Sequence, residues 1–276
     1  MYLTRFVAKN IKCFAQVELD FPKNEDGTYA GWHVLLGTNA TGKTTLLQAI
    51  AVGLIGASAG MRLISPATWV RRNEKYGEID LWFRQGEKDA SVGQPRTKDY
   101  QARLAVTGET SIALDGQDYT FPQIVLRNSG SRGKKDAALS GLIKGPYASD
   151  KTGWLVSGFG SFRRFMGGSD HELTYDRSKV GRVASLFKES VALDRSIKFL
   201  PDLYARSQDK NLKEEDRQAA VEECKQVGDI LNDLLPAAIR FARVDTQQVF
   251  FNALGIADVA LLDLSDGYRS FLALVL

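Results

Sequence analysis

The sequence is poor in the residues that build metal centres and disulfide frameworks. Its 276 residues include two cysteines, Cys13 and Cys224, and two histidines, His33 and His171. So few histidines exclude a histidine-rich metal site, and this cysteine density is typical of reduced, cytoplasmic proteins. No run of about 20 consecutive apolar residues is present, and the first residues lack the apolar core of a signal peptide. We therefore expect a cytoplasmic protein without a membrane span.

Strong charge of either sign is also missing. The chain has 36 lysines and arginines against 33 acidic residues, a net charge of +3. This balance excludes a dedicated DNA-coating protein, so any contact with nucleic acid needs a local basic patch. Hydrophobic residues make up 44% of the chain, enough for a large core in one big domain or two modest ones.

The hydrophobic pattern predicts an α/β protein. Alternation predicts strands at 2–9 and 16–21, and the apolar run WHVLLG (32–37) predicts a buried strand. The apolar residues after Lys43 predict a buried helix. Further strands are expected between 78 and 126 and at 153–160, helices between 178 and 236, and strands again from 239. We place domain boundaries so that 1–177 form a nucleotide-binding lobe, 178–236 a helical lobe, and 237–276 return to the first lobe.

One predicted helix carries apolar residues alternately four and three positions apart. These are Ala220, Cys224, Val227, Leu231 and Leu234. Such spacing is that of a seam for another helix. The helix packs either on its own domain or, through at most two heptads, on another helix.

The stretch GTNATGKTT (37–45) has the spacing of a phosphate-binding loop, G-x-x-x-x-G-K-[ST], between a predicted strand and a predicted helix. Glycines let successive N–H groups wrap a phosphate, and the helix start adds a positive dipole end. Lys43 is expected to reach the β and γ phosphates of ATP, and Thr44 to hold Mg²⁺ through its hydroxyl. The predicted nucleotide ligands in the loop are Gly37, Asn39, Ala40, Thr41, Gly42, Lys43, Thr44 and Thr45.

A second motif, LSDGYRS (264–270), lies near the end of the chain. Ser265 is expected to cap a helix, and Gly267 falls in its first turn, where N–H groups are free. The stretch resembles the signature motif of ABC-type ATPases. This resemblance implies that Ser265 and Gly267 bind the γ-phosphate held in the loop of a partner copy, so that a head-to-tail homodimer encloses two ATP molecules.

The branch of that family is narrowed by Asn39 in the loop and by the opening RFVAKNIKCFAQVELDF. Both resemble the RecF, SMC, Rad50 and OLD type ATPases. The resemblance implies a P-loop ATPase head of ABC type, with a mixed sheet around the loop helix, an antiparallel β subdomain and a helical lobe. It also implies that Lys12 lies near the nucleotide, that ATP and Mg²⁺ are the cofactors, and that ATP gates dimerisation.

The segment GWLVSGFGSFRRFMGGS (153–169) resembles one found in anti-phage defence ATPases such as the Septu and OLD-like systems. Those ATPases work beside a nuclease. The resemblance implies a role in phage defence or DNA repair, with a nuclease or other effector as partner and DNA as the target.

The chain also departs from this family. A Walker B strand, four apolar residues then Asp-Glu, is expected about one helix beyond the signature, but the sequence ends at Leu276. We therefore expect the front part of a longer protein or a truncated chain, which binds ATP through Lys43 and hydrolyses it weakly. No long coiled coil is present, which excludes a tethering arm. The Q-loop glutamine has only candidate positions, Gln123 or the segment after Val156.

Two alternatives stay open. VALLD can itself be a Walker B strand that ends at Asp263, which makes the protein another P-loop type. Nucleotide can also serve as structural glue in an assembly or regulatory module without useful turnover. A guanine-reading Asn/Thr-Lys-x-Asp motif is absent, which disfavours a GTPase.

The stretch RNSGSRGKK (127–135) is basic and glycine-rich, with no acidic residue. Such a loop suits DNA phosphates, because each neutralised phosphate releases counterions. A solvated surface loop has the same composition. The candidate DNA contacts are Arg127, Arg132, Lys134 and Lys135.

Overall fold

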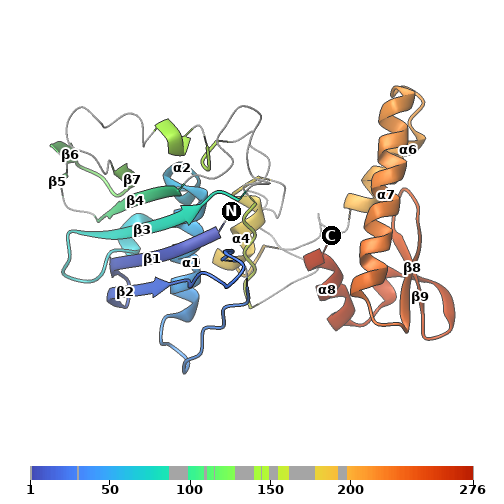
Figure 1. Ribbon diagram of the computed structural model, residues 1–276, viewed down its shortest axis with the longest axis horizontal. Helices are drawn as coiled ribbons and strands as arrows, with labels where there is room; N and C mark the ends of the chain where they lie inside the picture. The colour runs from blue at the N-terminus through green and yellow to red at the C-terminus, as the bar shows by residue number, and fades with distance from the viewer. Residues whose placement is uncertain are drawn as a thin grey trace. The chain divides into compact units, whose positions relative to one another are not determined.

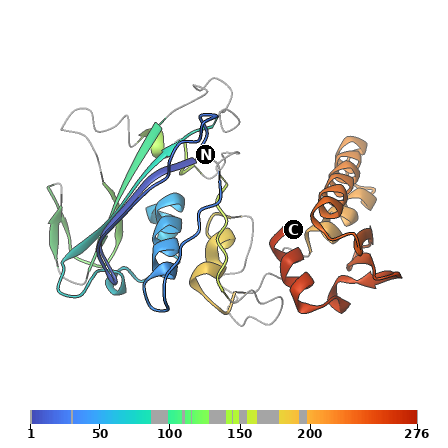
Figure 2. The ribbon, with the colours of Figure 1, turned by 60° about the horizontal axis from the view of Figure 1, so that its bottom comes forward.

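The computed structural model describes residues 2–29, 31–86, 99–108, 111–114, 116–127, 140–143, 145–148, 155–161, 178–191 and 198–275. The chain divides into two compact units (Figures 1 and 2). The first comprises Met1–Gly158 and Ser178–Phe187, and the second comprises Phe159–Arg177 and Lys188–Leu276.

The first unit is built on a five-stranded sheet with the order β2-β1-β3-β4-β7. Every pairing in it is antiparallel. Its strands are β1 (Tyr2–Ile11), β2 (Phe14–Asp20), β3 (Tyr76–Arg84), β4 (Asp99–Thr107) and β7 (Ile124–Arg127). A small hairpin, β5 (Ile112–Leu114) with β6 (Gln117–Tyr119), completes the strands of this unit that the structure describes. The strands predicted at 2–9, at 16–21 and between 78 and 126 are confirmed.

One face of the sheet packs on α1 (Lys43–Ile55), as Figure 2 shows. The strict alternation of β3 buries Ile79, Leu81 and Phe83 on that face. The glycine inside the helix is explained by close packing, since a Cβ at Gly53 would lie 2.0 Å from Leu81 Cδ1. Short helices that follow in the described part of this unit include α2 (Ala57–Gly60), η1 (Pro66–Thr68) and α4 (Gly181–Phe187), and residues 140–143 are also helical. The predicted buried helix after Lys43 is thus confirmed.

The strand predicted at 32–37 is wrong. These residues are extended chain without a paired strand. The side chains of Trp32, Val34 and Leu36 are 99%, 76% and 90% exposed. The apolar run has no hydrogen-bonded neighbour among the described strands, and a strand exists only as part of a ladder. The described sheet is consequently antiparallel throughout, where a mixed sheet was expected.

The second strand prediction that fails is the one at 153–160. Residues 155–160 are likewise outside any strand. They contact α4 instead. Gly158 N donates to Arg182 O at 3.0 Å, and Ser185 Oγ donates to Gly158 O at 3.3 Å. This segment therefore satisfies its backbone against a helix.

The second unit combines helices with a three-stranded antiparallel sheet, ordered β10-β9-β8. Its elements are α6 (Phe199–Gln208), α7 (Glu214–Leu234), β8 (Ile239–Val244), β9 (Val249–Ala253), β10 (Ile256–Ala260), η3 (Leu261–Asp263) and α8 (Asp266–Val275). One core joins Leu203, Leu231, Phe251 and Leu272. Lys188–Leu276 therefore fall in one unit, whereas a boundary between a helical lobe at 178–236 and the segment 237–276 was expected.

The apolar seam of α7 faces this same core. Ala220 and Leu231 are buried, and Cys224 and Val227 pack against the cluster. Leu234 is 52% exposed, and its neighbour Leu235 is buried in its place because the helix ends there. The helix thus packs on its own unit, as the first of the two alternatives predicted.

Candidate functional site

The loop 37–42 leads directly into α1, which begins at Lys43. Two residues of the loop are left-handed, Ala40 with φ 66° and Gly42 with φ 92°. Left-handed residues in such a turn direct consecutive N–H groups to one side, which creates a concave anion site. The first turn of α1 contains no acidic residue, so the positive end of its dipole is unopposed. This arrangement favours a bound anion.

Glycine is required at the end of the loop for two reasons. Its backbone is left-handed, and a Cβ at Gly42 would lie 2.6 Å from both Cys13 Sγ and Phe14 Cζ. The start of the loop is also tight, since a Cβ at Gly37 would lie 2.9 Å from Thr41 Oγ1. Thr41 Oγ1 in turn donates to Thr38 O at 2.9 Å. The glycine spacing read from the sequence therefore has a steric cause.

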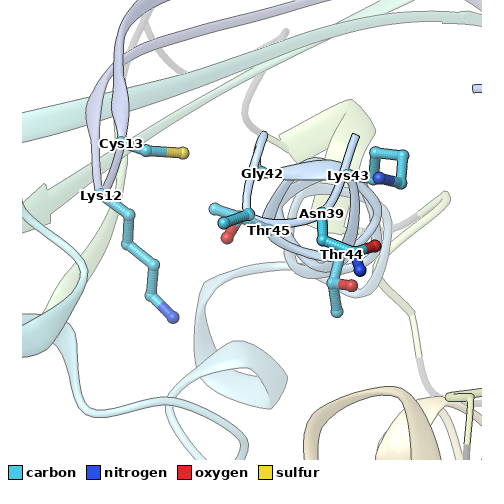
Figure 3. A pocket seen from close by; sticks show the side chains of 8 residues that line it. Lys12, Cys13, Asn39, Gly42, Lys43, Thr44 and Thr45 are labelled. Carbon is cyan, nitrogen blue, oxygen red and sulfur yellow. The ribbon is translucent and has the colours of Figure 1, made fainter. Parts of the chain in front are cut away.

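The side chain of Lys43 folds back over its own loop (Figure 3). Its Nζ donates to Gly37 O at 2.7 Å and to Thr38 O at 2.6 Å. An ammonium group bound only to exposed carbonyls can exchange them for a phosphate oxygen, a stronger acceptor. The lysine is therefore held at the mouth of the loop, where an incoming phosphate finds it.

A pocket of about 390 Å³ opens between the loop and the turn that joins β1 to β2 (Figure 3). This volume lies within the usual range of ligand sites. Its lining consists of Lys12, Cys13, Asn39, Ala40, Gly42, Lys43, Thr44 and Thr45. Seven of these eight were predicted from the sequence. Cys13 was missed, although it follows Lys12 directly, and the predicted Gly37 and Thr41 shape the loop without lining the pocket.

Lys12 forms the wall opposite the loop. Its Nζ lies 4.7 Å from the centre of the Trp69 ring, a cation–π contact. Burial lowers the pKa of Lys12 below its ordinary value. Trp69 is buried and its ring also stacks on Phe187 at the end of α4, at a centroid distance of 6.3 Å. Trp69 carried no signal in the sequence because its role depends on these tertiary contacts.

The predicted signature residues lie in the second unit. Ser265 directly precedes α8, and its carbonyl accepts the first helical bond from Arg269 N at 3.0 Å, so it is the N-cap residue as predicted. Gly267 is exposed, and a Cβ there would meet nothing within 4 Å. The side chain of Asp266 forms an ion pair with Arg269. The helix start is therefore open to a ligand.

The alternative Walker B geometry is not formed. Strand β10 ends at Ala260, and Asp263 lies in the 3-10 turn η3, where it is exposed. A Walker B acid directly follows a buried strand, whereas β10 is exposed over its first three residues and, among the described strands, pairs with β9 alone. Gln123, the Q-loop candidate, directly precedes β7. Its N–H donates to Thr107 Oγ1 at 2.9 Å, and it does not line the pocket.

Among the basic-loop candidates, Arg127 is engaged within the sheet. Its guanidinium pairs with Glu78 on β3, and its contact with DNA stays a prediction. Arg132, Lys134 and Lys135 lie outside the described residues. The described part of the chain has no group of three or more histidine, cysteine or acidic residues placed to hold a metal ion. None of its helices combines the length and apolarity that crossing a membrane needs.

Residues 5–235 match a family model described as "AAA domain". A solved structure from work on the ATP-driven dimerization and DNA-stimulated activation of SMC ATPases is 19% identical, covers 54% of this chain and 82% of its own, and has a TM-score of 0.34. A structure of the recombination mediator RecF with ATP is 11% identical, covers 99% of this chain and 78% of its own, and has a TM-score of 0.42. A search of curated proteins finds no match.

Proposed function

The chain belongs to the AAA domain family, and on this premise we propose that it is an ATPase head that binds ATP with Mg²⁺, dimerises around the nucleotide and hydrolyses it. The observation that carries the proposal is the loop 37–45. It combines left-handed Ala40 and Gly42, the unopposed start of α1, and Lys43 held at the loop mouth. These features are suited to a polyphosphate, which backbone N–H groups and the ammonium group of Lys43 would bind.

The residues of the pocket fit ATP and Mg²⁺. Lys43 is expected to exchange its carbonyl partners for the β and γ phosphates, and the hydroxyl of Thr44 is expected to hold Mg²⁺ together with phosphate oxygens. Lys12 supplies a second cation from the opposite wall. Bound Mg²⁺ would neutralise phosphate charge, and the protein groups orient the chain of phosphates against it.

We propose that the second half of the site comes from another copy of the chain. The start of α8 exposes Ser265 and Gly267, and a helix N-terminus can bind an anion through its N–H groups. Asp266, the acidic residue of this first turn, is paired with Arg269. In a head-to-tail dimer this element of one copy would bind the γ-phosphate in the loop of the other. Dimerisation would then require the triphosphate.

The proposal extends to what the ATP state controls. Dimerisation that depends on ATP can gate access of a nuclease or other effector to DNA, in phage defence or DNA repair. The resemblance of the loop, opening strands and signature to the RecF, SMC and OLD type ATPases supports this extension.

A second function is favoured by the composition of the pocket. Its described lining supplies cations, hydroxyls and an amide, but no carboxylate to activate water. A nucleotide-dependent assembly module, in which ATP joins subunits without useful turnover, would need groups that bind ATP but no carboxylate that activates water. Phosphate release measured on the purified chain separates the two functions.

The test of the proposed function is the mass in solution by light scattering, with and without ATP and Mg²⁺. We expect ATP to double the mass of the wild type. Ser265→Arg should abolish the doubling while ATP binding persists, because an arginine side chain obstructs the open helix start. Lys43→Ala should abolish both. A mass indifferent to ATP, despite demonstrated ATP binding, would refute the dimer.

A further inference from the structure

The turn between β1 and β2, which carries one wall of the pocket, is conformationally strained. Lys12 in the turn has φ 47°, and Asn10 near the end of β1 has φ 52°, so both are left-handed without being glycine. Lys12 is the first residue of a two-residue hairpin loop between the paired residues Ile11 and Phe14. Glycine is the residue favoured at such a position, since a side chain there is disfavoured. The turn therefore needs support from its surroundings to keep this shape.

That support comes from the segment 69–71. Lys12 N donates to Trp69 O at 2.8 Å, and Arg71 N donates to Asn10 O at 2.9 Å. A backbone bridge joins Ile11 to Val70. Any residue other than proline could make these backbone hydrogen bonds. They therefore explain why the segment 69–71 runs beside the turn, but not why it contains an arginine.

The remaining contact is made by a side chain. Arg71 Nη1 donates to the carbonyl of Cys13 at 2.7 Å. A charged donor makes a stronger hydrogen bond than a neutral one, and the planar guanidinium fixes its direction. Arg71 thus binds the end of β1 through its backbone N–H at Asn10 and the strained turn through its guanidinium at Cys13.

The orientation of this turn decides what faces the phosphate loop. Lys12 and Cys13 both line the pocket, and Cys13 Sγ lies so near the loop that a Cβ on Gly42 would approach it to 2.6 Å. A turn that relaxed its left-handed residues would turn the Lys12 side chain to a different side. The cation would then no longer lie opposite Lys43.

We infer that Arg71 is a positioning residue of the nucleotide site, which holds the β1–β2 turn in its strained form and so presents Lys12 to the phosphates. The inference rests on the proposed function and names a residue that acts through Lys12. Arg71 does not line the pocket itself.

The test is a double-mutant cycle on the affinity for ATP with Mg²⁺, measured by calorimetric titration of wild type, Arg71→Gln, Lys12→Ala and the double variant. The matched control is Arg72→Gln, since the adjacent Arg72 is exposed and makes no hydrogen bond or ion pair among the described residues. We expect Arg71→Gln to weaken binding by about tenfold and Arg72→Gln to leave it unchanged. In the Lys12→Ala background, Arg71→Gln should weaken binding by less than about twofold, because its effect passes through the lysine.

The outcomes are distinguishable. Multiplicative effects of the two substitutions, or an Arg71→Gln variant that binds ATP as well as wild type, would overturn the inference while the proposed function stands. A wild type that binds no ATP would overturn both. Arg71→Lys keeps the charge but not the planar donor, and it replaces Arg71→Gln in the cycle if that variant does not fold.

Discussion

Replacing Gly42 with alanine adds a single methyl group at the narrowest point of the site. Gly42 has φ 92°, and the new Cβ would lie 2.6 Å from Cys13 Sγ and from Phe14 Cζ. A left-handed alanine costs about 1 kcal/mol, and overpacking costs about 1–3 kcal/mol. The total of roughly 2–4 kcal/mol corresponds to a roughly 30-fold to 700-fold change in an equilibrium constant.

This free energy must appear in one of two measurements. If the loop keeps its shape without nucleotide, Gly42→Ala lowers the free energy of unfolding, which urea denaturation followed by circular dichroism measures. If the loop relaxes instead, the cost appears in the affinity for ATP, which calorimetric titration measures. The sum of the two losses is expected to fall within the stated range.

Gly31→Ala is the matched control, because it makes the same chemical change where nothing lies within 4 Å and the backbone is not left-handed. Gly31 is exposed and lies outside any helix or strand, so this variant should unfold at about the same urea concentration as wild type. Its ATP affinity should match that of wild type. A Gly42→Ala variant that binds ATP and unfolds like Gly31→Ala would refute the steric account of the loop.

Two further predictions concern Lys12 and Gly53. Burial lowers the pKa of Lys12, so the folded state binds fewer protons than the unfolded state between that lowered pKa and about 10.5, where stability from this group rises with pH. Lys12 also loses its charge, and with it its attraction for phosphate, over the same pH window. The affinity for ATP, measured as a function of pH, should therefore fall at alkaline pH. Lys12→Arg should make that fall smaller, because a guanidinium keeps its proton. Gly53→Ala places a Cβ 2.0 Å from Leu81 Cδ1 and should destabilise the protein by about 1–2 kcal/mol in urea, despite the better helix propensity of alanine. Leu81→Ala should reduce that penalty in the double variant, and strictly additive losses would contradict the packing of α1 on β3.

The elements that local sequence determines were predictable. The loop and the start of α1 follow from glycine and lysine spacing, because an anion nest and a helix N-terminus are made by neighbouring residues. The N-cap at Ser265 was predictable for the same reason. The antiparallel strands followed from alternation, since β3 buries every second residue.

The features that depend on distant partners were not predictable. Residues 32–37 have the composition of a buried strand, but a ladder needs a neighbour that composition does not reveal. The pairing of Arg127 with Glu78 joins residues 49 apart, so the basic stretch around Arg127 does not reveal it. The contact from Arg71 to Cys13 joins residues 58 apart, so nothing in the local sequence distinguishes Arg71 from Arg72.

The exposed segment around Trp32, Val34 and Leu36 has a practical consequence for experiments on the purified chain. Its exposed apolar side chains, together with a backbone that pairs with no described strand, can associate with the same segment of another molecule. Such colloidal association grows with protein concentration and needs no nucleotide. The ATP-dependent doubling of mass must therefore be read as a difference at one fixed concentration, and a dilution series separates the two kinds of assembly.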